Sequence, residues 1–429
     1  MLKRSTQTSM LLLVVAAALS PSPRPRPAAA AEDAPTPKEV FERRILPILK
    51  SPNPSSCTQC HLAGVDLKNY LLPSHEDTFA SLRDQGLIDL DRPERSKILA
   101  LIKMGEDDKG KSSLVHQKTR KAELEALADW IKRSAADPQM RKLPKLAAEK
   151  QAKPARPNEV IRHARKDRLL ESFTNNVWSM RFRCMNCHTE GNPQNDKLVK
   201  EHGERVAWFK AAGPEATLDY LRSSKLIDVK DPEKSLLLRK PLNEVKHGGG
   251  VKFVKGDQGY KAMRAFLEDY ARIVNDKYAE AKDLPKGNGK TISYGTESWL
   301  KLANTPDDWA DRYLQVSIYA YDEKKKEWEA EPVATTDRVV WGKGKLWQHT
   351  LTLLAEKGSE RARAWSKGTP SLPRGRYLIK VYVDKEGRLA KDWRANLGAD
   401  ELVGEVEVRA AWPAGYGNMT VVEAAKVKK

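Results

Sequence analysis

Cysteine is scarce in this chain of 429 residues, which has only four, and long apolar runs are scarcer still. So few thiols exclude a disulfide-rich secreted scaffold, in which cysteine exceeds about 8–10% of the residues. The one long apolar run, Met10–Leu19, is too short to span a bilayer, which requires about 20 residues. With 31% charged residues, the chain is expected to have no transmembrane segment once this run is removed.

The apolar run has the features of an export signal. Lys3 and Arg4 precede it, a Pro/Ser/Arg stretch and then four alanines follow it, and the simplest cleavage site lies between Ala31 and Glu32. We therefore expect a signal peptide at residues 1–31 and a mature protein that works in the periplasm or is otherwise exported.

All four cysteines lie in two copies of one motif, C-x-x-C-H, and no other thiol is present. Redox-active disulfides or the two halves of a zinc site would use such pairs, but neither explains the histidine after each pair. Covalent haem attachment explains this histidine, because each thiol bonds one vinyl group of the haem and the histidine is the proximal iron ligand. The pattern therefore predicts two covalent haem c groups. Their expected ligating and attaching residues are Cys57, Cys60, His61, Cys184, Cys187 and His188.

These two segments resemble the attachment sites of c-type cytochromes. The resemblance implies a compact helical domain around each haem, with one helix leading into the attachment loop and another packed against it. Apolar residues recur at helical spacing over residues 37–51 and 120–134, on either side of the first motif. The sequence around the first motif therefore fits this plan.

The second motif is followed by a repeat of the sequence that follows the first. Residues 79–99 resemble residues 218–238, with Ser96 and Ser235 at corresponding positions. The final-helix aromatics Trp130 and Tyr270 follow those serines by 34 and 35 residues. The repeat predicts two tandem all-α cytochrome c-like domains.

The last third of the chain is of a different class. Eight of the 11 tryptophans lie there, among partly alternating segments separated by turn residues, which is typical of an Ig-like β-sandwich. Exposed aromatics would suit contact with a polysaccharide or a protein, although most of these tryptophans are expected in the core. The expected organisation is a signal peptide at 1–31, cytochrome c-like domains at 32–136 and 159–285, a basic Ala/Pro linker at 137–158, and the β-rich domain at 286–429.

The sixth iron position determines what each haem does. Occupied by His or Met, it favours electron transfer, and left open it binds peroxide or another small ligand. His247, in VKHGGGVKF, is the expected distal ligand of the second haem, because glycines let the backbone approach a flat macrocycle. This HGGG and the following GDQGYKAMRAFLEDY resemble a planctomycete-type cytochrome c domain. The alternative is a flexible glycine turn that carries a histidine.

The corresponding loop of the first repeat has no HGGG. His116, just before the closing helix, is the first choice of distal ligand, and Met104 is the alternative, which would raise the reduction potential. His75 and His202 each follow their proximal histidine by fourteen residues. They are weaker alternatives, because the repeat places them at different positions and both are expected at solvated helix starts.

The net charge of +18 would ordinarily suggest nucleic acid, but the export signal and the haem motifs argue against it. Two explanations of this positive charge remain: it attracts an acidic redox partner, or it belongs to a lysine-rich surface that is merely solvated. We expect an electron carrier between periplasmic redox partners and assign no catalytic residue. A di-haem enzyme of the cytochrome c peroxidase type, with one open haem, is the alternative, so whether the protein is an enzyme stays open.

Overall fold

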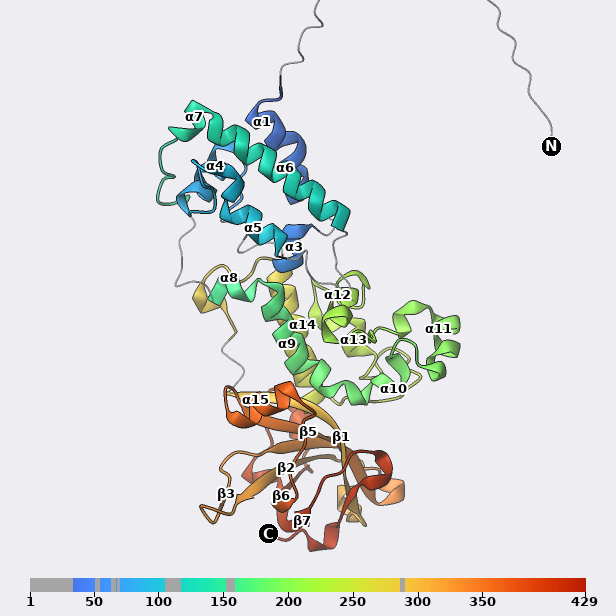
Figure 1. Ribbon diagram of the computed structural model, residues 1–429. Coiled ribbons are helices and arrows are strands. Elements are labelled where there is room, and N and C mark those ends of the chain that lie inside the picture. The colour runs from blue at the N-terminus through green and yellow to red at the C-terminus, as the bar shows by residue number, and fades with distance from the viewer. Residues whose placement is uncertain are drawn as a thin grey trace, which may run out of the picture.

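The computed structural model describes residues 34–50, 55–62, 67, 70–104, 117–151, 159–285 and 290–429. The predicted signal peptide lies outside these ranges. Figure 1 shows three parts stacked in chain order, with a second group of helices between the first group and a β-sheet. Within the described residues, no helix is long and apolar enough to cross a membrane.

The first group of helices encloses its own hydrophobic core. Trp130 of α6 is fully buried and lies 5.5 Å from Phe41 and 6.1 Å from Phe79 between ring centroids. The predicted linker begins within this group, because Met140 of α7 is buried in the same core. The helices are α1 (Pro37–Val40), a π-helical turn (Phe41–Ile45), α2 (Leu46–Lys50), α3 (Ser56–Cys60), α4 (His75–Asp84), α5 (Lys97–Lys103), α6 (Gln117–Ala136) and α7 (Pro138–Arg141).

The second group has a separate core, in which Phe173 of α9 and Phe266 of α14 meet at 5.3 Å between ring centroids. A 3-10 segment, η4 (Trp178–Arg183), leads into the second motif. The remaining helices are α8 (Glu159–His163), α9 (Lys166–Asn176), α10 (Met185–His188), α11 (Asp196–His202), α12 (Pro214–Ser223), α13 (Leu236–Arg239) and α14 (Gln258–Val274).

The internal repeat has the same local structure in both groups. The buried hydroxyl of Ser96 accepts a hydrogen bond from Asp89 N at 3.1 Å, and that of Ser235 accepts one from Asp228 N at 3.0 Å. The carboxylates of Asp89 and Asp228 each accept two further backbone N–H groups in the same turn. A short local motif therefore specifies the same turn twice.

The C-terminal part is one mixed sheet in the order β7-β6-β2-β4-β5-β1-β8, with β3 paired to β2 off this path. β1 and β8 are parallel, and the other pairs are antiparallel. The strands are β1 (Thr291–Ala303), β2 (Tyr313–Asp322), β3 (Glu327–Trp328), β4 (Ala334–Val339), β5 (Leu346–Glu356), β6 (Gly375–Asp384), β7 (Leu402–Ala410) and β8 (Thr420–Glu423). Two short helices, α15 (Glu360–Lys367) and α16 (Arg388–Lys391), interrupt them.

The predicted β-sandwich is wrong. The end of the chain after β8 pairs with the opposite edge strand β7, where Glu405 and Lys428 exchange backbone hydrogen bonds of 2.8 and 3.1 Å. A single sheet thus curls until its two edges almost meet, as in a barrel. Alternating strands predict that one face is buried, but they do not distinguish two facing sheets from one curled sheet.

Two tandem all-α cytochrome c-like domains are also the wrong description of the helical part. Leu62, directly after the first motif, is buried in the core of the second group, and its N–H donates to Ala164 O at 2.9 Å. Trp393, from the C-terminal part, packs on that core as well. The second group therefore completes its core with residues from both neighbouring parts, which sequence periodicity within one helix cannot reveal.

Candidate functional site

The histidine of the second motif, His188, has its ring orientation fixed by a hydrogen bond to the backbone. His188 is the last residue of α10, and its Nδ1 lies 2.7 Å from Val206 O. Since a carbonyl only accepts, Nδ1 carries the proton, and Nε2 is left unprotonated, which is the form of the nitrogen that can ligate a metal. Burial lowers the pKa of His188, and this favours the neutral form that a metal requires.

His247 lies in the loop between α13 and α14 and is held in the same way. Its ring Nδ1 lies 2.7 Å from Gly250 O, and its backbone N–H donates to Asn243 Oδ1 at 3.2 Å. Gly250 has φ +66°, a conformation that favours glycine. A Cβ on Gly249 would lie 3.1 Å from His247 Cε1, so this glycine leaves room for the ring.

The two histidines lie close together although 59 positions separate them in the chain. Their ring centroids are 6.1 Å apart, and their planes differ by 10°. One metal ion bonded to two imidazoles on opposite sides, at about 2.0–2.1 Å each, would hold the centroids roughly 6 Å apart. The structure thus brings together the predicted proximal and distal ligands of the second haem with a separation that fits one iron.

The four thiols are free in this structure. Burial raises the pKa of Cys184 to about 11, although Arg183 and Lys252 oppose the shift, and Cys187 is exposed. In the first motif, burial and the nearby Glu123 raise the pKa of Cys57 to about 11. Such thiols stay protonated at neutral pH, which is unlike the thiolates of redox-active pairs. Across the described chain, no three His, Cys, Asp or Glu side chains form a metal-binding group, so the zinc alternative gains no support.

The first motif is anchored from α6. Ser55 caps α3 in a capping box with Thr58, and Glu123 accepts a hydrogen bond of 2.6 Å from Ser56 N. Cys60 is exposed, and His61 ends the helix beside Arg165, with which it forms an isolated β-bridge. The first attachment segment therefore lies at the boundary between the two helical groups.

The distal candidates of the first haem are placed very differently. His116 lies outside the described residues, and Met104, at the end of α5, is 75% exposed. His75 is buried, 5.6 Å from Phe41 and 5.9 Å from Trp130 between ring centroids, so its expected solvated position is wrong. His202 ends α11 rather than starting a helix, and its side chain is 64% exposed.

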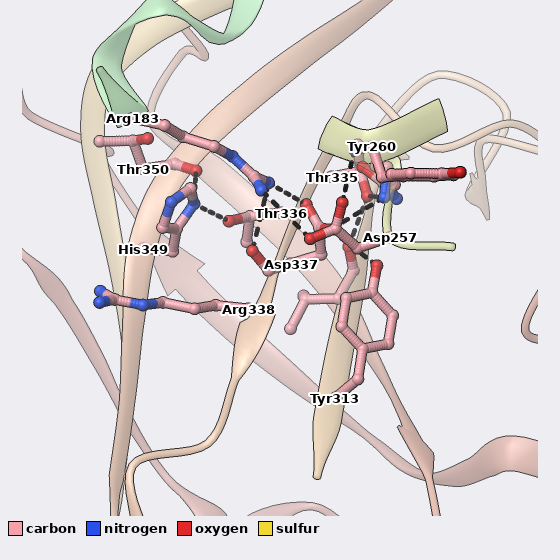
Figure 2. A network of polar contacts seen from close by, with 12 residues as sticks. Arg183, Asp257, Tyr260, Tyr313, Thr335, Thr336, Asp337, Arg338, His349 and Thr350 are labelled. Atoms are coloured by element: carbon pink, nitrogen blue, oxygen red, sulfur yellow. Dashed lines mark hydrogen bonds and ion pairs between the residues drawn. The ribbon is translucent and has the colours of Figure 1, made fainter. Parts of the chain in front are cut away.

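A buried ionic cluster that the sequence did not predict lies next to the second motif. Arg183, directly before Cys184, forms ion pairs with Asp257 at the start of α14 and with Asp337 of β4 (Figure 2). The three residues are distant in sequence, and only the position of Arg183 beside the motif could have drawn attention to it. Sequence reasoning also missed His163 of α8, whose Nε2 contacts Asp269 of α14 in the core.

Comparison of this chain with protein-family models, with curated proteins and with solved structures gives no match. Any functional conclusion therefore rests on the motifs and on the geometry of their surroundings.

Proposed function

We propose that this protein is an exported di-haem c-type cytochrome that carries electrons between periplasmic redox partners. The pair of neighbouring imidazoles, with ring centroids 6.1 Å apart and nearly parallel planes, is the observation that carries the proposal. Cys184 and Cys187 would hold the second haem, with His188 and His247 as its axial ligands. Bound haem would supply an iron that accepts and releases one electron at a time.

Ligation on both sides suits electron transfer. Because both histidines are fixed through Nδ1 by backbone carbonyls, their Nε2 positions need little rearrangement when the iron changes charge. Two histidines would also leave no open position at the second iron for peroxide. Only the first haem, whose distal candidate His116 lies outside the described residues, would offer an open position in the peroxidase alternative.

The surroundings of the first motif fit a group that carries carboxylates. Arg120 of α6 is 2% exposed and donates to Ile102 O at 2.8 Å, while its Nε and Nη2 have no hydrogen-bond partner among the residues that the structure describes. Buried guanidinium N–H groups without acceptors are destabilising, and a haem propionate is an acceptor that would satisfy them. Cys57, Cys60 and His61 would attach and ligate this haem.

The second site also supports the proposed acidic partner. Lys240 and Lys252 lie close enough to contribute, after burial and the nearby His247, to the lowered pKa of His188. Their positive charges would attract a negatively charged protein toward this part of the surface. Local charge at the site is a stronger argument than the net charge of the whole chain.

The proposal is tested by producing the mature protein together with haem-attachment machinery. A pyridine haemochrome assay should give two covalent haems per chain, and optical and EPR spectra should be low-spin and unaffected by peroxide. His247→Ala should make the second haem high-spin without loss of attachment, whereas the exposed control His202→Ala should leave it low-spin. A fully low-spin His247→Ala spectrum would refute the ligand assignment, turnover of peroxide would favour the enzyme, and absence of covalent haem would refute the proposal.

A further inference from the structure

The cluster of Arg183, Asp257 and Asp337 joins the second attachment segment to the sheet (Figure 2). Arg183 is bonded in the chain to Cys184, and its positive charge acts on the Cys184 thiol. Its side chain is 9% exposed, that of Asp257 is 3% exposed and that of Asp337 is 1% exposed. A change of charge at the second haem would therefore act on these groups through a water-poor interior.

Asp337 is the carboxylate that directly pairs with the arginine. Besides a close ion pair from Arg183, it accepts hydrogen bonds from the Tyr313 hydroxyl at 2.7 Å and from Gln258 N at 3.2 Å. Arg183 Nη2 also donates to the Asp337 backbone carbonyl at 3.3 Å. Three donors thus satisfy the ionised form of Asp337, and together they orient the guanidinium.

Asp257 has weaker compensation for its charge. Two backbone N–H groups, of Val254 and Tyr260, bind its oxygens at 2.8 and 2.6 Å, but Arg183 is 3.8 Å away. Within this trio, one guanidinium balances only one of the two carboxylate charges. Burial, and after it the charge of Asp337, raises the pKa of Asp257 to about 7.

We propose, on the basis of the proposed haem function, that Asp257 is the proton acceptor of the second haem site and that Asp337 positions Arg183 to make it so. When one electron from an external one-electron donor enters that haem, Asp257 takes up one proton from solvent and forms an O–H bond. The donor would lose one electron to the bound haem, and the proton on Asp257 would offset the added negative charge. The sheet thereby becomes part of the redox site.

Other charged or titratable groups face the cluster from each packed element, and none replaces Asp257 in this role. Tyr313 donates to Asp337, and burial raises its pKa far above neutral. His349 of β5 has a pKa lowered well below its ordinary value by burial, so it is neutral throughout the relevant pH range. The remaining cations around the cluster are Arg338 of β4, Lys252 before α14 and Lys261 within α14.

The test is a redox titration of the full-length holoprotein between pH 5.5 and 9, with the two haems resolved. The midpoint potential of the second haem should fall as pH rises through 7, by up to about 59 mV for each tenfold drop in proton concentration. Asp257→Asn should abolish this dependence, and the exposed control Asp276→Asn should retain it. Asp337→Asn should raise the midpoint, because it removes a buried negative charge, and should shift the pH dependence to lower pH.

An infrared difference spectrum of the reduced minus the oxidised wild-type protein tests the same proton without a substitution. A new carbonyl band of a protonated carboxyl group on reduction is expected at pH 8. A pH-dependent midpoint that persists in Asp257→Asn, or the absence of the band, would overturn the inference. A haem count below two would instead refute the proposed function, so the two failures are distinguishable.

Discussion

The glycines around His247 have different functions although they are adjacent in sequence. Gly250 accommodates a positive φ, whereas Gly249 is needed for the space beside the His247 ring. Around Gly248 there is no atom within 4 Å of where a Cβ would be. The HGGG motif therefore contains one position that is expected to tolerate alanine and two that are not.

Gly249→Ala should weaken the proposed bond between His247 and the haem iron. The new Cβ would lie 3.1 Å from His247 Cε1 and 3.4 Å from its Nε2, so the ring must shift by a few tenths of an ångström from the position in which its carbonyl partner holds it. Changes in ligand orientation of this kind weaken a metal–ligand bond by roughly 10-fold. Because protons compete for the freed nitrogen, the acid-induced low-spin to high-spin transition should move up by about one pH unit.

Gly248→Ala is the matched control for this change and should leave the transition where it is in the wild type. If the low-spin to high-spin transition occurs at the same pH in the wild type and in Gly249→Ala, Gly249 does not position the His247 ring.

Asp269 should make the protein sensitive to acid. Burial raises its pKa, but hydrogen bonds from His163 and from the Tyr278 hydroxyl, at 2.9 Å, outweigh burial and lower it. A lowered folded-state pKa means that this stabilisation is present above about pH 4 and is lost as pH falls further. Asp269→Asn should therefore reduce the unfolding free energy at pH 7 by about 1–3 kcal/mol and reduce the additional loss at pH 3.

Urea unfolding at the two pH values measures this effect, with the exposed Asp276→Asn as control. If Asp269→Asn loses as much stability between pH 7 and pH 3 as the wild type, the assignment of acid sensitivity to Asp269 is wrong.

At the scale of elements, the contact of η4 with β1 connects the second motif to the sheet. Gly295 of β1 lies directly against the backbone of Ser179, in the segment that leads to Cys184. A side chain at Gly295 would overlap the carbonyl oxygen of Ser179 and contact Phe182. The glycine is thus required by close approach of two backbones rather than by its own φ angle.

Gly295→Ala should lower the unfolding free energy by roughly 1–3 kcal/mol, because backbone on both sides must move to relieve the overlap. Chemical denaturation monitored by circular dichroism measures the loss. Gly398→Ala is the control within the same sheet domain, since a Cβ at that position would have no atom within 4 Å. Similar stabilities for the two variants would refute a tight η4–β1 contact.

At the scale of the whole molecule, the second helical group and the sheet are joined by several polar and aromatic contacts. Lys261 of α14 donates to Asn396 Oδ1 at 3.0 Å, and Tyr260 lies 5.6 Å from Trp393 between ring centroids. Lys357 forms an ion pair of 2.8 Å with Glu171 of α9. Together with the buried Arg183–Asp337 pair, these contacts lead us to expect that the two parts fold as one unit.

The two parts should therefore unfold together. In urea, amide hydrogen exchange of α14 and of β4 should lose protection at the same denaturant concentration. Asp337→Asn should lower that concentration equally for both elements, because it leaves Arg183 buried without its main partner.

Asp400 is an exposed residue of the same sheet domain, and it serves as the control. Asp400→Asn should leave unchanged the denaturant concentration at which α14 and β4 lose protection. Separate transitions for α14 and β4 would contradict a single unit.

The sequence by itself determined the local features of this protein. The two C-x-x-C-H motifs, the helices of residues 37–50 and 117–136, and the repeated turn at Ser96 and Ser235 are readable because neighbouring residues specify them. The same reasoning identified His188 and His247 as candidates for one site. Their two covalent haems and electron-carrying function stay predictions that the experiments above address.

Only the tertiary structure decided the closure of the sheet, the passage of Leu62 into the second core and the pairing of Arg183 with Asp337. Periodicity along a strand or helix reports which face is buried, but it does not name the surface that covers that face. Partners separated by more than 100 residues are selected by shape, burial and charge across the whole fold. For this reason the sequence located the motifs, and the structure located the residues that surround them.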